Sequence, residues 1–195
     1  MASSGSSYHH GDLRAACLSA ALELLEEDGA TGLSLRAVAR RAGVSSMAPY
    51  RHYPNRDALI SAVAAEGYRE LARDLAAAHP APATPDDLVD IGVAYIRFAL
   101  DRPAMFRVMF AEPCDPANDE RVAAVAAITD YVRDIVHRVF PGAEPEPLAN
   151  AVWALVHGLA FLHLDGKLDA SRPDEIADRV RAAFHAILSA SRTEG

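Results

Sequence analysis

The chain has 195 residues, 51% of them hydrophobic, and a formal net charge of −8 at pH 7. This length and apolar content allow one full-sized domain or two modest ones with a real core, and they exclude disorder throughout. An acidic balance argues against nucleic acid as a partner, because Lys and Arg supply most of the affinity for phosphate. The charge distribution removes that objection: residues 1–56 hold six arginines against five acids, and the remaining residues hold thirteen basic against twenty-two acidic side chains.

Cysteine usage and the composition of the first residues indicate a cytoplasmic protein. Cys17 and Cys114 have neither the spacing of metal ligands nor the density of a disulfide scaffold, so we expect two reduced thiols. The first seven residues are small and polar and lack the basic-then-apolar order of a signal peptide. The uncharged run over residues 147–164 is interrupted by polar side chains, which favours a buried helix over a membrane span, and no membrane partner is expected.

A first helix is predicted from the apolar stripe over residues 12–29. Asp12 or Gly11 lies near its N-cap, and Gly29 ends it. Residues 1–8 have the composition of a disordered arm. His9 and His10 are adjacent, but the further fixed ligands of a metal site are missing, so a solvated arm near nucleic acid is favoured over a metal site.

The next stretch has the pattern of two short helices joined by a tight turn. Ser34 caps the first of them, and Gly43 ends it in a conformation that only glycine adopts without cost. Ser45 caps the second helix, which is expected to end near residue 53, and Pro49 is tolerable only close to the unpaired first turn. This arrangement is a helix-turn-helix, whose second helix enters a major groove of DNA. Residues 29–56 contain five arginines and no acid.

A long helix follows, capped by Asn55 and ending near His79. The proline-rich segment 79–85 is the one clear boundary. Beyond it the apolar spacing and the prolines predict helices at about 85–102, 104–112, 118–140, 145–165 and 173–192. No segment alternates like a half-buried strand, so the expected fold is all-α with about nine helices. A helix-turn-helix head over 1–56 is joined by the connecting helix 55–79 to a body over 80–195.

Several short motifs match the pattern of one known family. They are Gly29, Ser34, Ala42-Gly43-Val44-Ser45, Tyr50-Arg51-His52-Tyr53 and Arg56-Asp57-Ala58-Leu59. With them the N-terminal part resembles the TetR/AcrR family of bacterial transcriptional regulators. The body resembles the subgroup named for a Trp-His-Gly motif, through Trp153, His157 and Gly158. The resemblance implies a homodimer, usually a repressor, that releases a DNA operator when a small-molecule effector binds in the body, with no enzyme activity, catalytic residue, metal or cofactor.

Roles in DNA binding follow from side-chain chemistry along the helix-turn-helix. Ser45, Ser46 and Met47 are expected at base edges, where hydroxyls bond to several bases and Met contacts a thymine methyl. Arg36 and the helix end capped by Ser34 are expected to clasp one phosphate. The other side chains suited to phosphate are Tyr50, Arg51, His52, Tyr53 and Arg56, the first and last of which the family resemblance also implies. The alternative for each is a solvated surface residue.

The last two helices predict dimerisation. Residues 148–164 are apolar nearly all round, so a single core cannot use every side of this helix. The final helix has an apolar stripe made of Ile176, Val180, Ala183, Phe184, Ile187 and Leu188. Two such helices from each of two chains form a four-helix interface, and a two-fold dimer reads an inverted repeat with its recognition helices about 34 Å apart. The alternative is an unusually apolar core helix in a monomer.

Aromatic and methionine side chains of the body are the candidates for an effector pocket. They are Tyr95, Phe98, Met105, Phe106, Met109, Phe110 and Tyr131. Trp153 and His157 lie four residues apart on one helix face, where an indole and an imidazole provide a stacking wall and a polar contact. The alternative is plain core, because cores use the same residue types.

Two rival functions remain open from the sequence. An enzyme or carrier with a helical cavity is one, although no Ser-His-Asp arrangement, glycine-rich phosphate loop or metal-spaced cluster is visible. The other rival is a transcriptional activator, because the sign of regulation depends on where the operator lies relative to a promoter.

Overall fold

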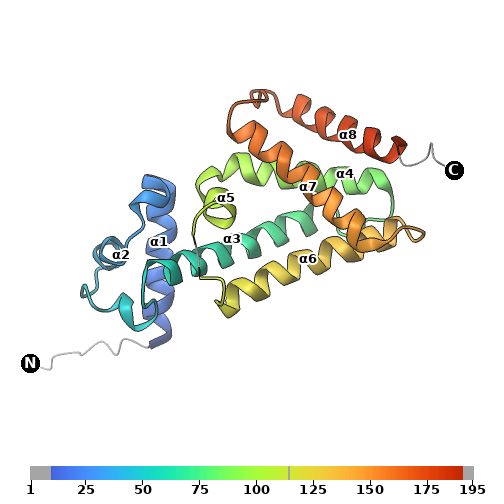
Figure 1. The fold of residues 1–195 in the computed structure, drawn as a ribbon. Coiled ribbons are helices and arrows are strands. Elements are labelled where there is room, and N and C mark those ends of the chain that lie inside the picture. The colour runs from blue at the N-terminus through green and yellow to red at the C-terminus, as the bar shows by residue number, and fades with distance from the viewer. Residues whose placement is uncertain (1–9, 114, 191–195) are drawn as a thin grey trace, which may run out of the picture.

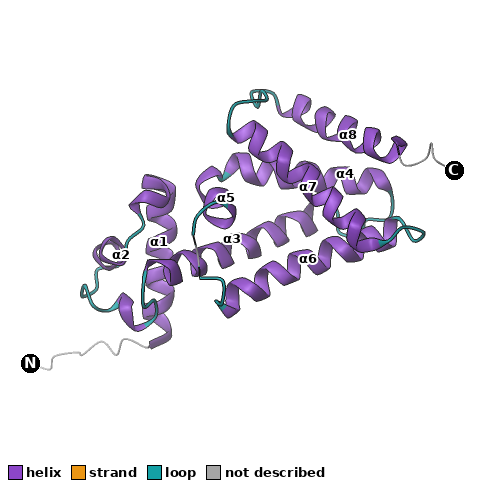
Figure 2. Cartoon of the chain, in the orientation of Figure 1, coloured by secondary structure: helices purple, strands orange, loops and turns teal. Residues whose placement is uncertain are grey.

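The computed structural model describes residues 10–113 and 115–190, which form eight α-helices and one short 3-10 helix. No strand occurs within these ranges (Figure 2). The all-α prediction is therefore confirmed. The predicted arm with His9, the thiol of Cys114 and the side chain of Leu188 lie outside what the structure describes.

The head is built from α1 (His10–Gly32), α2 (Leu35–Arg41) and η1 (Pro49–Arg51). The Ser34 hydroxyl accepts a hydrogen bond from the backbone N–H of Ala37 (3.1 Å), which confirms the predicted cap of α2. Gly43 ends this helix with φ of +66°, in the left-handed region that glycine adopts without strain. The predicted end of α1 at Gly29 is only partly right. Gly29 leaves the helical conformation (φ 69°, ψ −172°), but a further turn continues to Gly32.

The second helix of the helix-turn-helix is shorter than predicted. Instead of an α-helix from Ser45 to Tyr53, the chain forms a turn at residues 46–48 followed by η1. The cause is Pro49, which has no N–H to donate to the carbonyl of Ser45. That carbonyl accepts instead from Ala48 N (2.9 Å), and His52 N donates to Pro49 O (3.0 Å), both of which are three-residue spacings.

The connecting helix α3 (Arg56–Ala78) runs from the head into the body (Figure 1). Its N-cap is Asn55, whose side-chain oxygen accepts from Ala58 N (2.8 Å), as predicted. It packs against α1 in the head and against three body helices. At Gly67 it approaches the next layer so closely that an added Cβ would lie 2.6 Å from Sδ of Met105 and 2.7 Å from Sδ of Met109. A larger residue at this position would therefore require the side chains of Met105 and Met109 to move.

Five helices make up the body, at positions close to those predicted. They are α4 (Pro85–Asp101), α5 (Pro103–Phe110), α6 (Asp119–Val139), α7 (Pro145–Leu164) and α8 (Pro173–Ala190). Four of them begin with proline, whose missing N–H is not needed at a first helical position. Thr84 and Asp87 form a reciprocal capping box at the start of α4.

Head and body share one apolar core. A single cluster of buried side chains extends from Leu13 in α1 to Phe184 in α8, and the short helix α5 packs against α1, α3 and α4. The division of the chain at residues 56 and 80 therefore remains a prediction based on sequence.

Helix α7 is covered on one side only. It packs on α4, α6 and α8, yet Trp153 and Leu162 are 48% and 44% exposed. By length and composition it is the one described helix apolar enough to cross a membrane, and 28% of its apolar window is buried. On α8, Ile187 is 42% exposed. The two last helices thus present apolar side chains that the described part of this chain does not cover.

Candidate nucleic-acid interface and cavity

Most of the predicted base-reading and phosphate-binding side chains lie on the surface of the head. Ser45, Ser46 and Arg51 are exposed, Met47 is 67% exposed and Tyr50 is 40% exposed. Residues 46–48 form a turn and η1 is a short 3-10 helix, which is wound more tightly than an α-helix. These side chains therefore do not share one long helical face. Their contact with DNA stays a prediction.

The arginines of the head fall into two groups. Arg36, Arg40 and Arg51 are exposed and make no ion pair or side-chain hydrogen bond with any residue that the structure describes. Arg36 and Arg40 are four residues apart, so they share one face of α2. Arg41 is different, because its guanidinium pairs with Glu23 (3.2 Å) and Glu27 of α1. Three cations of the head are therefore free to meet phosphate.

Arg56, predicted to contact phosphate, is partly engaged within the protein, and its contact with DNA stays a prediction. Its guanidinium donates to the backbone carbonyls of Leu33 (3.1 Å) and Ala30 (2.8 Å), and it lies 3.6 Å from Glu112. Hydrogen bonds from a charged donor stabilise by roughly 1.5–3 kcal/mol each, more than the roughly 0.2–1 kcal/mol of an exposed ion pair. Arg56 therefore ties the start of α3 to the end of α1.

Tyr53 was predicted to contact phosphate from the surface of the head, but the structure buries it. Its side chain is only 2% exposed, and its hydroxyl donates to the carbonyl of Arg14 (3.4 Å), so it is a core residue of the head and not a phosphate ligand. Burial raises the pKa of this hydroxyl. His52 is half-buried, and its Nε2 atom is enclosed without a hydrogen-bond partner among the described residues.

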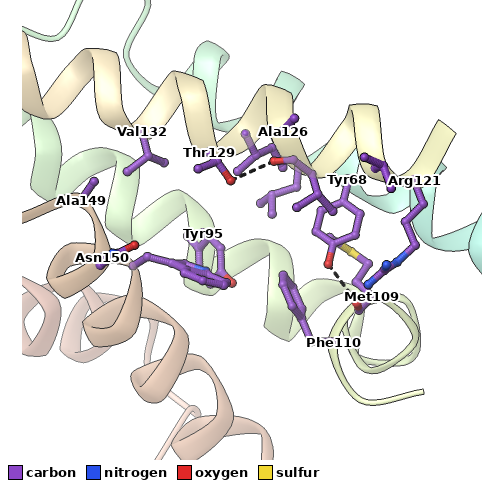
Figure 3. Close-up of a pocket in the computed structure, with 15 residues that line it drawn as sticks. Tyr68, Tyr95, Met109, Phe110, Arg121, Ala126, Thr129, Val132, Ala149 and Asn150 are labelled. Carbon is purple, nitrogen blue, oxygen red and sulfur yellow. Dashed lines mark hydrogen bonds between the residues drawn. The ribbon is translucent and has the colours of Figure 1, made fainter. Parts of the chain in front are cut away.

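The body has a cavity of about 540 Å³, partly open to solvent, among α3, α4, α5, α6 and α7. This volume is within the range of small-molecule sites. One long wall consists of α6 side chains, and the facing walls include Tyr68, Tyr95 and Phe110 (Figure 3). Trp153 of α7 also lines the cavity. Most of the lining is apolar, as expected for a site that binds its ligand mainly by burial.

The structure separates the predicted pocket residues into two sets. Tyr95, Met109 and Trp153 line the cavity, together with Phe110. The other candidates do not line it. Phe98 and Met105 face other hollows, Phe106 is fully buried, and Tyr131 and His157 pack beside the cavity without forming its wall. For these five residues the alternative of plain core or supporting side chain is the better description.

His157 lies within a cluster of aromatic rings directly behind the cavity wall. Five rings have their centroids 4.7–6.3 Å from the centroid of the imidazole: Tyr95, Phe106, Phe110, Trp153 and Phe161. The Tyr95 hydroxyl and His157 Nδ1 form a 2.8 Å hydrogen bond. Burial lowers the pKa of His157, because the cationic form is poorly solvated there, and burial raises the pKa of Tyr95. Both groups are therefore neutral, and they position the two cavity walls relative to each other.

Sequence reasoning missed the polar part of the cavity. Arg121, Thr129 and Asn150 line it, and none belongs to the aromatic and methionine cluster that was used as the signal. The aliphatic wall of α6, including Val122 and Val125, was missed as well. Its spacing is that of any amphipathic helix, so only the position of α6 opposite α4 and α7 identifies it.

No group of three or more His, Cys, Asp or Glu side chains with metal-binding geometry occurs in the described parts of the chain. The polar lining of the cavity is formed by a guanidinium, an amide and hydroxyls. These groups can bind a ligand through hydrogen bonds and charge.

Two family models match the chain. The model described as bacterial regulatory proteins, tetR family, matches residues 18–63, and the model described as tetracyclin repressor-like, C-terminal domain, matches residues 88–187. Together they cover the helix-turn-helix and the cavity-bearing body. Neither match addresses the Trp-His-Gly subgroup, which stays a prediction.

Known relatives agree with these matches. An HTH-type transcriptional regulator of Mycobacterium tuberculosis is 35% identical over 107 residues, which are 52% of this chain and 46% of the relative. The chain thus spans about half the length of the curated relatives it matches.

Solved structures show the same fold along nearly the whole chain. A protein of unknown function from Rhodococcus sp. RHA1 is 32% identical, with a TM-score of 0.77 over 92% of this chain and 97% of that one. NalD, described as the secondary repressor of the MexAB-OprM multidrug efflux pump in Pseudomonas aeruginosa, is 21% identical with a TM-score of 0.60, over 91% and 97% of the two chains.

Proposed function

Because the chain belongs to the TetR family of bacterial regulatory proteins, we propose that it is a DNA-binding transcriptional regulator of the cytoplasm and not an enzyme. In this proposal it is a homodimeric repressor that binds an inverted-repeat operator through its two heads. A small molecule that enters the cavity of the body releases it from DNA. The family resemblance of the helix-turn-helix and the repressor NalD, which has the same fold, support this assignment.

The observation that carries the proposal is the group of free cations on the head. Arg36, Arg40 and Arg51 are exposed and unpaired among the described residues, in a chain whose net charge is −8. Many arginines of the body, in contrast, are neutralised by acids, for example Arg102 by Asp74 (3.0 Å). Phosphate contacts need such uncompensated arginines, and the adjacent exposed hydroxyls suit the same partner.

The dimer is proposed to form through α7 and α8. Trp153, Leu162 and Ile187 are large apolar side chains exposed on these helices, and isologous pairing of the same two helices would cover them in both subunits. The heads lie at the opposite end of the molecule from α8 (Figure 1). A two-fold dimer therefore presents two heads at a distance that the body controls.

Release by an effector is proposed to act through α3 and α5. Both helices line or border the cavity and both pack against α1 of the head. A ligand that favours one arrangement of these helices changes the distance between the two heads and so weakens DNA binding. By linkage, operator DNA must weaken effector binding by the same factor.

Selection of bound fragments from a random DNA library tests the proposal. We expect a palindrome of two half-sites whose centres lie about one helical turn apart or a multiple of it. Failure to enrich any sequence would contradict the DNA-binding proposal, and enrichment of a single, asymmetric half-site would contradict the dimer.

An arginine substitution in the head, measured on the operator sequence that the library selects, tests the role of the unpaired cations. We expect R51M to weaken operator binding and to lower the slope of log affinity against log salt by about 1, because one phosphate contact is lost. The matched control is R172M, which removes an exposed arginine that pairs with Glu175 in the body. A salt slope that is unchanged in R51M would contradict the assignment of Arg51 to phosphate.

A further inference from the structure

The cavity contains one cation, at one of its two ends. Arg121 lies in the first turn of α6, and its side chain extends toward Met109 and Tyr68 (Figure 3). Its Nε atom is enclosed and has no hydrogen-bond partner among the described residues. No carboxylate in the described part of the chain pairs with this guanidinium.

Two nearby acids are engaged elsewhere, whereas Asp119, in the same turn as Arg121, is exposed and forms no ion pair with it in the described part of the chain. Glu120 pairs with Arg14 (2.6 Å) and Arg69 (3.4 Å), and Glu112 lies 3.6 Å from Arg56. A buried Nε–H group without a partner is unfavourable, because its desolvation is not offset by a hydrogen bond. The half-buried Arg121 therefore brings to the cavity a positive charge that no carboxylate of the described chain neutralises.

The rest of the cavity is an elongated slot with a mostly apolar lining, in which Thr129 and Asn150 are uncharged polar groups. Its α6 wall runs from Arg121 to Val132, which at the rise of an α-helix is a length of about 16 Å. Val122, Val125 and Ile128 lie between these two residues on the lining wall. Ala149 and Asn150 lie toward the opposite end of the slot from Arg121 (Figure 3). A molecule that fills this space needs an apolar body with one anionic end.

We propose that the effector is an amphipathic organic carboxylate, whose carboxylate pairs with Arg121 and whose apolar body lies along α6. The inference rests on the proposed function in assigning the cavity to the effector, and it adds the chemical class. The planar guanidinium suits a carboxylate, because its parallel N–H groups match both oxygens. The apolar part contributes affinity by burial against the aliphatic wall.

Binding is measured without DNA, through the single tryptophan. Trp153 lines the cavity, so occupancy changes its fluorescence. The probes are dodecanoate, dodecanol and dodecylamine, which share one apolar chain and differ in the charge of the head group. We expect saturable binding of dodecanoate, with affinity roughly ten- to a hundredfold above that of dodecanol, and the weakest binding for the amine.

Two variants and a control assign the preference to Arg121. We expect R121M to reduce dodecanoate affinity roughly ten- to a hundredfold and to leave dodecanol affinity unchanged. R121K keeps the charge and retains most of the preference for the acid, although without a two-pronged contact. The control is R133M on the same helix, because Arg133 pairs with Asp130 and does not line the cavity.

Equal affinity for acid and alcohol, an unchanged preference in R121M, or no fluorescence response to dodecanoate would each overturn the inference. None of these outcomes affects the proposed DNA binding, which is measured separately on the selected operator without any ligand. Loss of operator binding with carboxylate binding intact would overturn the proposed function alone.

Discussion

At the scale of single residues, the same side-chain type has different roles depending on its neighbours. Arg51 is exposed and unpaired among the described residues, Arg56 caps the carbonyls at the end of α1, and Arg121 faces an apolar cavity. Each role is determined by which acceptors lie within reach of the guanidinium. Residue type by itself therefore identifies a cation, and the surroundings decide whether that cation is available to a partner.

The burial of His157 can be tested through the pH dependence of the free energy of unfolding. Its pKa is lowered by burial from the ordinary value of 6.5, so the folded protein binds the proton less readily than the unfolded chain. The stability that His157 contributes is fully present above pH 6.5 and is lost as the pH falls through the folded-state pKa. The slope from one such group is at most about 1.4 kcal/mol per pH unit.

We expect H157N to flatten the acid side of the stability profile. Asn can keep a hydrogen bond to the Tyr95 hydroxyl but does not titrate. Part of the slope remains, because the pKa of His163 is lowered by burial and by Arg179 and acts in the same direction. Thermal unfolding between about pH 5 and 8 measures the effect, with H137N on the exposed side of α6 as control. An unchanged acid slope in H157N would contradict the neutral, buried imidazole.

At the scale of helices, the head is connected to the cavity by short contacts as well as by the long helix α3. Glu120 in the first turn of α6 pairs with Arg14 of α1 and Arg69 of α3. The hydrogen bond from Arg14 lowers the pKa of Glu120, so this link is present at neutral pH. Arg121, the proposed effector contact, is the next residue along the chain. We therefore expect a shift of this turn on effector binding to reach the head through these ion pairs.

If the ion pairs of Glu120 transmit effector binding to the head, removing them should weaken the coupling between effector binding and operator binding. We expect E120Q to bind dodecanoate and operator separately with nearly normal affinity, because the exposed ion pairs contribute only about 0.2–1 kcal/mol each. The factor by which each ligand weakens the other should fall, because α6 no longer holds α1. D119N is the matched control, since it removes an exposed acid from the same turn. A coupling factor equal to that of wild type would exclude this link from the mechanism.

At the scale of the whole molecule, the open face of α7 is the surface through which we propose that two chains pair. Ala154, Gly158 and Leu162 are exposed and spaced by four, so they lie on one face of the helix. A Cβ added at Gly158 meets no atom within 4 Å inside the chain. The protomer by itself therefore has no packing reason for glycine at this position, whereas close approach of a second helix provides one.

We expect G158L to leave the protomer folded and to break the dimer. The new side chain points into open space in one chain, but it enters the proposed interface between two. Sedimentation velocity distinguishes monomer from dimer, and circular dichroism checks that helix content is retained. G142L is a matched control, because an added Cβ at Gly142 also meets nothing within 4 Å and the residue lies outside the helices. A G158L protein that remains a dimer would place the interface elsewhere.

Much of the fold was predictable from local chemistry. Ser34 and Asn55 were identified as N-caps, Gly43 as the end of a helix, and prolines as starts or boundaries, because these effects act within a few residues of the chain. The same local rules wrongly predicted that the second helix of the helix-turn-helix is a regular α-helix. Pro49 was allowed for, but its loss of a single hydrogen bond was enough to replace an α-helix by η1.

The all-helical fold, most helix ends, and the order of a basic helix-turn-helix before an acidic body could all be predicted from the amino-acid sequence. Which side chains are accessible and unpaired became clear from the packing of the helices. It buried Tyr53, engaged Arg56 with the carbonyls of α1, and placed Arg121 at the end of an apolar cavity. The physical reason is that helix formation depends on neighbours in sequence, whereas exposure and pairing depend on residues that only folding brings into contact.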